Sequence, residues 1–222
     1  MYNLKIVTNL ICIVILSYLA GSISTSLIIG KITKGIDIRN YGSGNAGGTN
    51  AFRVLKWKTG VIVAAIDIFK GFAAAQWISQ LNIFNVYLNT GTIAPVLAGA
   101  AAVLGHCYPV FTGFRGGKGV ATTGGMLISI FPLAFLTGIL ALAAVVFTSG
   151  YVSLGSLTGA TIMTFTILIV YLIFPLKVSI TLLVASILIA IFVFFNHRSN
   201  IKRLIRGTEN RFNSLRILVR KK

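Results

Sequence analysis

The sequence is poor in the residues that most often build metal sites and hydrolase sites. It has three carboxylates, Asp37, Asp67 and Glu209, against 20 Lys and Arg, and two cysteines, Cys12 and Cys107, with no CxxC spacing. Carboxylates are too scarce for a Ser-His-Asp arrangement, and no metal-ligand cluster surrounds either cysteine. We therefore expect no bound metal ion and no cofactor.

Long apolar runs make up most of the chain, which has 222 residues, 56% of them hydrophobic and 10% charged. A hydrocarbon core of about 30 Å requires about 20 helical residues. Strong apolar runs cover Ile6–Ile29, Val61–Leu81, Thr92–Tyr108, Val120–Gly150, Val152–Phe174 and Val178–Asn196. The first exceeds the hydrophobic region of a signal peptide, so we expect it to stay in the mature chain. The composition predicts one all-α, polytopic transmembrane domain over residues 1–222.

The basic residues predict how these runs are oriented. They cluster in the connections 30–60 and 109–119 and in the tail, whereas residues 81–91 carry no charge. The positive-inside bias makes the three basic segments cytoplasmic. Attraction to anionic membrane lipids then accounts for the net charge of +17, and nucleic acid is a poor candidate partner. The tail, at about 198–222, repeats apolar residues at helical spacing and should lie along the cytoplasmic interface.

The predicted orientation requires one more membrane crossing than the six apolar runs provide. The chain must cross an even number of times between the cytoplasmic residues Lys118 and Arg198, yet three runs lie between them. Val120–Gly150 is longer than one crossing needs, and a helix should break at its Phe131-Pro132. Splitting this run predicts a bundle of seven spans with the N-terminus outside and the C-terminus cytoplasmic. The alternative is one long, kinked helix.

Two glycine-rich segments have compositions that no hydrophobic core requires. The first, NYGSGNAGGTNAFR at 40–53, offers neutral hydrogen-bonding groups and one guanidinium, which together suit phosphate or carbonyl oxygens. The second, FRGGKG at 114–119, places an ammonium among glycines directly before an apolar helix, where a helix N-terminus favours an anion. The candidates in these segments are Ser43, Gly44, Asn45, Thr49, Asn50, Arg53, Gly116, Gly117, Lys118 and Gly119. A flexible loop and an ordinary basic turn are the respective alternatives.

Three further features contain candidate residues. His197 and Asn200 follow the last apolar run, where they can point inward from the cytoplasmic end of a span. Ser153 comes just after the Gly150 break, on the same side in the seven-span topology. Asp67 and Lys70 are three residues apart and share a helical face, so they should pair; both a functional role and simple charge neutralisation stay open.

Five segments resemble the bacterial acyl-phosphate-dependent glycerol-3-phosphate acyltransferases, which are membrane enzymes of phospholipid synthesis. They are GSIST at 21–25, GSGNAGGTNAFR at 42–53, DIFKG at 67–71, GHCYPVFTGFRGGKGVAT at 105–122 and HRSNIKRLIRGTE at 197–209. The family usually has proline at position 24, alanine at 48 and lysine at 115, where this sequence has Ser24, Gly48 and Arg115. These departures leave every other charged or amide position in place.

The resemblance implies transfer of a fatty acyl group from acyl phosphate to the 1-hydroxyl of glycerol 3-phosphate, giving lysophosphatidate and phosphate. It also implies a plasma (inner) membrane enzyme with a cytoplasmic active site. In the matching family segments, the residues around the substrates correspond to Ser43, Arg53, Lys118, His197 and Asn200. A phosphate transporter and a non-catalytic lipid-binding scaffold are the rival classes, but the sequence shows no convincing internal repeat, and a scaffold would not explain two glycine loops.

The sequence also favours direct transfer without an acyl-enzyme. No histidine is followed by Asp at HxxxxD spacing, because the fifth residue after His106 is Phe111 and the fifth after His197 is Lys202. Acyl phosphate is already activated, so positioning and charge neutralisation can supply much of the acceleration. A substrate phosphate or His197 would take the proton, and Ser43, Asn45 or backbone N–H groups would hold the oxyanion.

Overall fold

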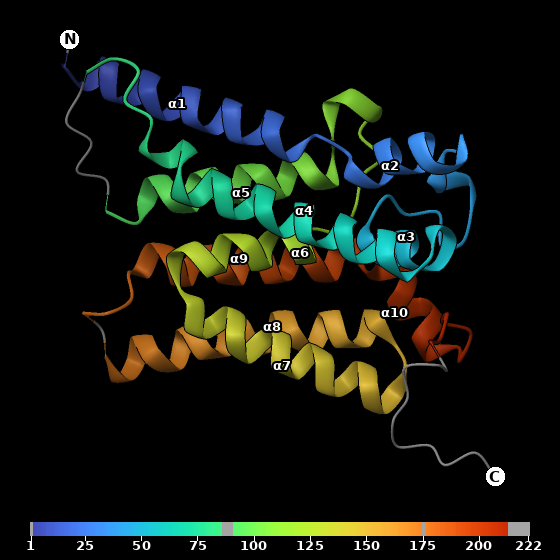
Figure 1. Ribbon diagram of the computed structural model, residues 1–222. Helices are drawn as coiled ribbons and strands as arrows, with labels where there is room; N and C mark the ends of the chain where they lie inside the picture. Colours follow the sequence, from blue (N-terminus) through green and yellow to red (C-terminus); the bar gives the residue numbers. More distant parts are fainter. Residues whose placement is uncertain (1, 86–90, 175, 213–222) are drawn as a thin grey trace. The chain divides into compact units, whose positions relative to one another are not determined.

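The structure is a computed structural model that describes residues 2–85, 91–174 and 176–212. Within these ranges the chain forms α-helices and short 3-10 helices, and no β-strand. The helices belong to two compact units, Met1–Ile130 and Phe131–Lys222 (Figure 1). The predicted all-helical fold is therefore confirmed.

The first unit is built on three long helices that run alongside one another (Figure 1). They are α1 (Tyr2–Gly21), α4 (Trp57–Gln76) and α5 (Ile93–Cys107), and α1 packs on α5 while α4 packs on α5. The shorter helices are α2 (Thr25–Lys34), α3 (Gly48–Leu55) and α6 (Val120–Ile130). Three 3-10 helices, η1 (Ile38–Asn40), η2 (Ile78–Gln80) and η3 (Val110–Thr112), lie in the connections.

Glycines bring α4 and α6 into backbone contact. A Cβ on Gly71 would overlap the carbonyl oxygen of Thr122, and a Cβ on Gly125 would overlap that of Ile68. Small residues are how membrane helices approach closely, since no hydrophobic effect drives helices together within lipid. The tight α4–α6 pair holds the first residues of α6, and the glycine segment before them, close to α4.

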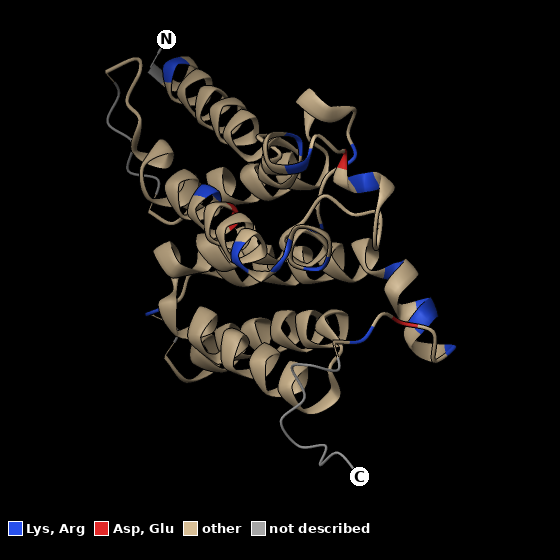
Figure 2. Cartoon of the chain, turned by 45° about the vertical axis from the view of Figure 1, so that its right-hand side comes forward, with Lys and Arg blue, Asp and Glu red and all other residues tan. Residues whose placement is uncertain are grey.

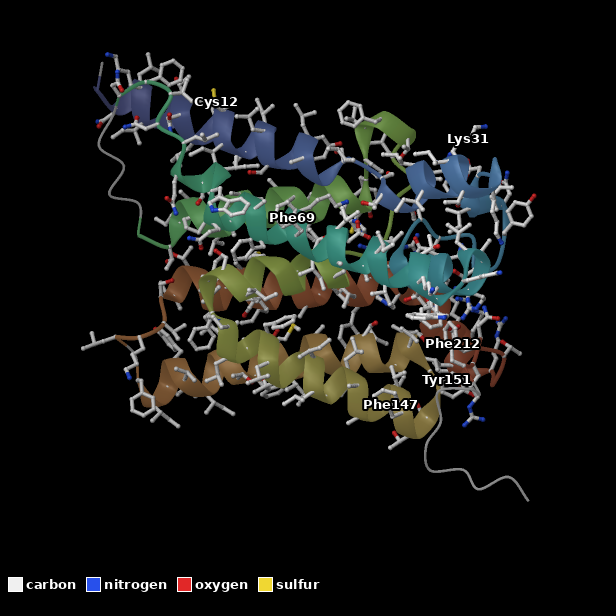
Figure 3. All side chains as sticks on the ribbon, in the orientation of Figure 1. Cys12, Lys31, Phe69, Phe147, Tyr151 and Phe212 are labelled. Atoms are coloured by element: carbon white, nitrogen blue, oxygen red, sulfur yellow. The ribbon has the colours of Figure 1, made fainter. Side chains whose placement is uncertain are left out.

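The second unit contains α7 (Pro132–Ser149), α8 (Val152–Ile173), α9 (Ile180–Asn196) and α10 (Arg198–Ile205). α7 packs along α8, and α8 packs along α9. α9 and α10 meet at an angle of 59° at His197. The chain after α10 then returns to the α7–α8 turn, where Phe212 N–H donates to Gly150 O at 2.9 Å and Tyr151 lies close by (Figure 3).

Among the described residues, five helical segments are long and apolar enough to cross a membrane, or six if α9 and α10 form one span. The predicted break at Phe131-Pro132 is confirmed, since α6 ends at Ile130 and α7 begins at Pro132, whose missing N–H suits a helix start. α6 has 11 residues, fewer than a full crossing needs. The part of the predicted tail at 213–222 lies outside the described residues.

The first predicted span contains a break in its helix. Asn3–Lys34 forms one candidate membrane span, which includes the predicted apolar run Ile6–Ile29, but within it α1 ends at Gly21 and α2 begins at Thr25. The break falls in the GSIST segment, and Lys70 Nζ donates to the freed carbonyls of Gly21 and Ile23, at 3.3 and 2.8 Å. A buried ammonium from a neighbouring helix therefore stabilises an interruption that local sequence does not reveal.

Candidate active site

The first glycine segment forms a tight loop closed by Asn50. This side chain is buried, accepts from Ser43 N–H at 2.9 Å, and donates to the carbonyls of Ile38 and Tyr41 at 3.1 and 3.0 Å. Gly42 takes a positive φ of 63°, and a Cβ there would overlap the Asn50 amide oxygen. Asn50 thus shapes the loop from beneath, which leaves the exposed Ser43 hydroxyl on its outer side.

The second glycine segment is anchored to the end of α5. Gly116 N–H donates to Cys107 O at 3.1 Å, and Gly117 N–H donates to His106 O at 3.0 Å. These two amides therefore face the protein, contrary to the simplest picture of a glycine cradle. Lys118 follows directly and is half-buried. In the first turn of α6, Thr123 N–H donates to Gly119 O at 2.8 Å, and the N–H groups that precede it have no intrahelical acceptor.

The two segments lie next to each other in the first unit. A Cβ on Gly47 would stand 4.0 Å from Gly117 Cα, which is ordinary van der Waals contact. A pocket of about 420 Å³ opens beside this contact, lined by Asp37, Arg39, Asn40, Gly44, Arg115 and Gly116. Two loops that are 60 to 80 residues apart in the sequence thus share one polar pocket. Figure 2 shows basic residues gathered over α2, α3 and the start of α4 in the same unit.

One wall of the pocket is held by an ion pair. Arg39 Nη2 lies 2.7 Å from Asp37 Oδ2, and Arg39 Nη1 donates to Thr112 O at 2.8 Å. The guanidinium hydrogen bonds hold the pKa of the Asp37 carboxyl below its ordinary value. Asp37 and Arg39 neutralise each other, so Arg115 supplies the net positive charge of the lining. None of these three residues was among the sequence candidates, although Asp37 is one of three carboxylates in a basic chain and needed a partner.

Arg53 and Lys118 are the two basic residues predicted from the glycine segments, and neither is among the residues that line this pocket. Arg53 is in the last turn of α3, which packs against α4, and its side chain is half-buried. Lys118 precedes α6, which packs against the same α4. Of the remaining loop candidates, Asn45 is half-buried, Thr49 is exposed at the start of α3, and Gly119 has a positive φ of 86°.

The second unit contains a polar cluster centred on Glu209. Ser153 Oγ and Asn200 Nδ2 donate to Glu209 Oε1 at 3.0 and 2.6 Å, and Arg203 Nε donates to Glu209 Oε2 at 2.7 Å. Burial alone would raise the pKa of Glu209, but the hydrogen bonds from Asn200, Arg203 and Ser153 outweigh it and lower that pKa. The carboxylate therefore joins two predicted site residues, Ser153 and Asn200. It was not itself a candidate.

His197 occupies the bend between α9 and α10. The residue is 2% exposed, and its Nδ1 lies 2.8 Å from Val193 O. A carbonyl only accepts, so Nδ1 carries a hydrogen and the neutral ring has its basic nitrogen at Nε2. The helix bend thus fixes both the tautomer and the direction of the imidazole.

The predicted pairing of Asp67 and Lys70 is confirmed. Lys70 Nζ lies 2.8 Å from Asp67 Oδ1, and both residues are buried within the first unit.

The family model for glycerol-3-phosphate acyltransferases matches residues 11–207. The chain belongs to this family. It is 43% identical to the glycerol-3-phosphate acyltransferase of Chlorobium chlorochromatii strain CaD3, over 91% of this chain and 97% of that protein. It is 48% identical to that of Geobacillus kaustophilus strain HTA426, over 89% of this chain and 93% of that protein.

Solved structures of the same family have the same fold. The crystal structure of PlsY (YgiH), an integral membrane glycerol 3-phosphate acyltransferase, in its glycerol 3-phosphate form matches with a TM-score of 0.81 and 36% identity. The match covers 95% of this chain and 99% of that one. The lysophosphatidic acid form matches with a TM-score of 0.79 and the same identity, over 94% of this chain and 98% of that one. This glycerol-3-phosphate acyltransferase family member is therefore an integral membrane protein, as its apolar helices indicate.

Proposed function

We propose that this protein transfers a fatty acyl group from acyl phosphate to the 1-hydroxyl of glycerol 3-phosphate, giving lysophosphatidate and inorganic phosphate for phospholipid synthesis. The observation that carries the proposal is the meeting of two glycine loops at a basic pocket in a member of this family. Solved relatives described as glycerol 3-phosphate and lysophosphatidic acid forms support the acceptor and the product.

Both substrates are phosphate anions, and the first unit offers cations for them. Arg53 provides a fork that can bind phosphate with two parallel hydrogen bonds, and Lys118 provides a point charge beside the N-terminus of α6. Arg115 adds a guanidinium at the pocket. We assign Ser43, Asn45 and Thr49 as neutral partners of substrate oxygens, and Gly44, Gly116, Gly117 and Gly119 as the backbone that lets substrate approach. Asn200 and Ser153 are assigned to substrate binding from the sequence, and His197 is assigned a catalytic role.

The reaction follows from the donor's chemistry. The 1-hydroxyl oxygen of glycerol 3-phosphate attacks the acyl carbonyl carbon, the carbonyl oxygen becomes an oxyanion, and the bond from this carbon to the phosphate oxygen breaks. Inorganic phosphate leaves with the electron pair, and the hydroxyl proton passes to a substrate phosphate oxygen or to His197 Nε2. Ser43, Asn45 or loop amides stabilise the oxyanion. Direct attack needs no nucleophile from the protein.

Direct attack predicts that no covalent acyl-enzyme accumulates. Purified protein is incubated with radiolabelled acyl phosphate in the absence of glycerol 3-phosphate, then denatured and separated from lipid. We expect no label on the protein, because the acceptor hydroxyl is the only nucleophile in the mechanism. Stable label on Ser43, Ser153 or Cys107 that transfers to glycerol 3-phosphate on its addition would overturn direct transfer.

We further propose seven spans in the plasma (inner) membrane, with the N-terminus outside and the active site facing the cytoplasm. The charge distribution supports this topology, because basic residues fill the connections 30–60 and 109–119. The helix break at Phe131 supports it too, because it divides the longest apolar run into α6 and α7.

Cysteine accessibility tests this topology. In a chain with Cys12 and Cys107 replaced by Ala, single cysteines at Ser129 or Phe131 should react with impermeant reagent from outside. A cysteine at Lys31, which projects from α2, should react from the cytoplasm (Figure 3). Labelling of the Ser129 or Phe131 position from the cytoplasm alone would contradict the split of this run into two crossings.

The choice of donor separates this function from related acyl transfers. Purified protein in detergent micelles is given glycerol 3-phosphate with either acyl phosphate or an acyl thioester of the same chain length. We expect lysophosphatidate from acyl phosphate and none from the thioester. The reverse preference would remove acyl phosphate from the proposal and leave the family assignment standing.

A further inference from the structure

A buried charge network in the first unit lies directly beneath the second glycine loop. Asp67 Oδ1 lies 2.8 Å from Lys70 Nζ and 3.5 Å from His106 Nδ1, and it accepts from Thr25 Oγ1 at 3.1 Å. The residues Asp67, Lys70 and His106 are 2%, 7% and 7% exposed. Lys70 also donates to the carbonyls at the α1–α2 break. One carboxylate thus joins α2, α4 and α5.

The network reaches the loop through His106. The backbone carbonyl of His106 accepts from Gly117 N–H at 3.0 Å. The imidazole lies against the same residue, because a Cβ built on Gly117 would overlap His106 Nε2. Gly117 therefore rests on both the backbone and the ring of His106, and the next residue is Lys118.

We propose that His106, held by Asp67 and Lys70, is a positioning residue. Through its contact with Gly117 it sets the position and direction of the loop that carries Lys118. This inference rests on the proposed function, in which Lys118 binds a substrate phosphate. His106 does not touch substrate and acts through Gly117. The proposal also gives Asp67 and Lys70 a role, since they fix the position of the ring.

The geometry favours positioning over simple charge neutralisation. Asp67 and Lys70 already neutralise each other at 2.8 Å, so charge balance does not require a third polar residue. The His106 ring fills the space that Gly117 leaves by lacking a Cβ. Misplacement of a substrate-binding group by about 1 Å can cost about 100-fold in rate, so a shift of Gly117 on the His106 ring, passed on to the neighbouring Lys118, would slow the reaction.

Two substitutions of His106 separate positioning from stability. His106→Ala removes the ring, whereas His106→Asn keeps an amide able to bond Asp67 and still empties the space beneath Gly117. We expect both variants, measured as folded protein, to lose about ten- to a hundredfold in kcat/KM for glycerol 3-phosphate. A residue with only a structural role would lower the thermal midpoint and leave kcat and KM of the folded enzyme unchanged.

Val96→Ala is the matched control. Val96 is buried on α5, ten residues before His106, or about 15 Å along the helix. This substitution should lower the thermal midpoint and leave the kinetics intact. Wild-type kinetics in both His106 variants would overturn the proposal.

A double-mutant cycle tests the contact with the loop. Gly117→Ala alone places a methyl group against the ring, whereas in the His106→Ala/Gly117→Ala protein that methyl occupies the vacated space. We expect the double variant to be no worse in kcat/KM than the worse single variant. Additive losses would show that ring and loop act independently and would contradict the proposal.

Thermal unfolding of the same four proteins needs no substrate. We expect the double variant to lose no more of the thermal midpoint than the worse single variant. Losses in midpoint that simply add would show that the His106 ring and Gly117 do not interact, and would contradict the inference. If the wild-type protein transferred no acyl group while the midpoints were coupled, the proposed function would fail and the contact would stand.

Discussion

Replacing Lys118 or Arg53 by Ala is expected to lower kcat/KM for glycerol 3-phosphate about tenfold or more in each case. In the proposed mechanism each substitution removes a charge-assisted hydrogen bond to phosphate, which contributes about 1.5–3 kcal/mol. The two residues belong to the two glycine segments that meet in the first unit, so the proposal expects loss of either to leave the phosphate incompletely neutralised. Steady-state kinetics of purified variants in micelles measure the effect.

Lys58→Ala is the control for these two variants. Lys58 is an exposed lysine at the start of α4, where its ammonium lies 5.8 Å from the Trp57 ring centroid. The Lys58→Ala substitution removes one positive charge from the same unit without changing either glycine segment. The kinetics of this variant should match those of the wild type. Near-normal kinetics in both Lys118→Ala and Arg53→Ala would contradict the placement of the phosphate site.

Replacing Glu209 by Gln or Ala is expected to destabilise the second unit strongly. The carboxylate accepts hydrogen bonds from Ser153, Asn200 and Arg203, and its side chain is 5% exposed. Removing the charged partner should cost about 1.5–3 kcal/mol. Thermal unfolding followed by circular dichroism measures it, and the neighbouring, exposed Asn210→Ala is the matched control.

The effect of Glu209 should depend on pH in a defined direction. Its pKa in the folded protein is lowered from the ordinary value of 4.5, so its contribution to stability is complete above that value. The contribution is lost as the pH falls through the lowered folded pKa. The difference in thermal midpoint between wild type and Glu209→Gln should therefore be largest at neutral pH and shrink in acid. A difference that grows in acid would contradict the assigned hydrogen bonds.

Features that depend on one segment of chain could be predicted from the sequence. The break at Phe131-Pro132 was one, because proline lacks an N–H and ends the helix before it. The Asp67–Lys70 pair was another, because residues three apart share a helical face. The two glycine loops could be recognised because no apolar core requires their composition.

Features that depend on distant partners could not be predicted in the same way. The α1–α2 break is stabilised by Lys70, a residue about 50 positions away. Asn50 was expected to face substrate, but its amide closes its own loop. The amides of Gly116 and Gly117 bond to α5, and Glu209 was missed because Ser153 and Asn200 meet it only in the folded chain. To predict any of these features, one would need to know which hydrogen-bonding partner the folded chain brings next to the residue.

We propose that the protein itself transfers the acyl group of acyl phosphate to glycerol 3-phosphate. The most direct measurement gives the purified protein both substrates in micelles and follows lysophosphatidate and inorganic phosphate together. We expect one phosphate for each lysophosphatidate, with formation of both products requiring both substrates, and both rates falling together in Lys118→Ala. Phosphate released without lysophosphatidate, or no product from a folded protein, would contradict the proposed activity.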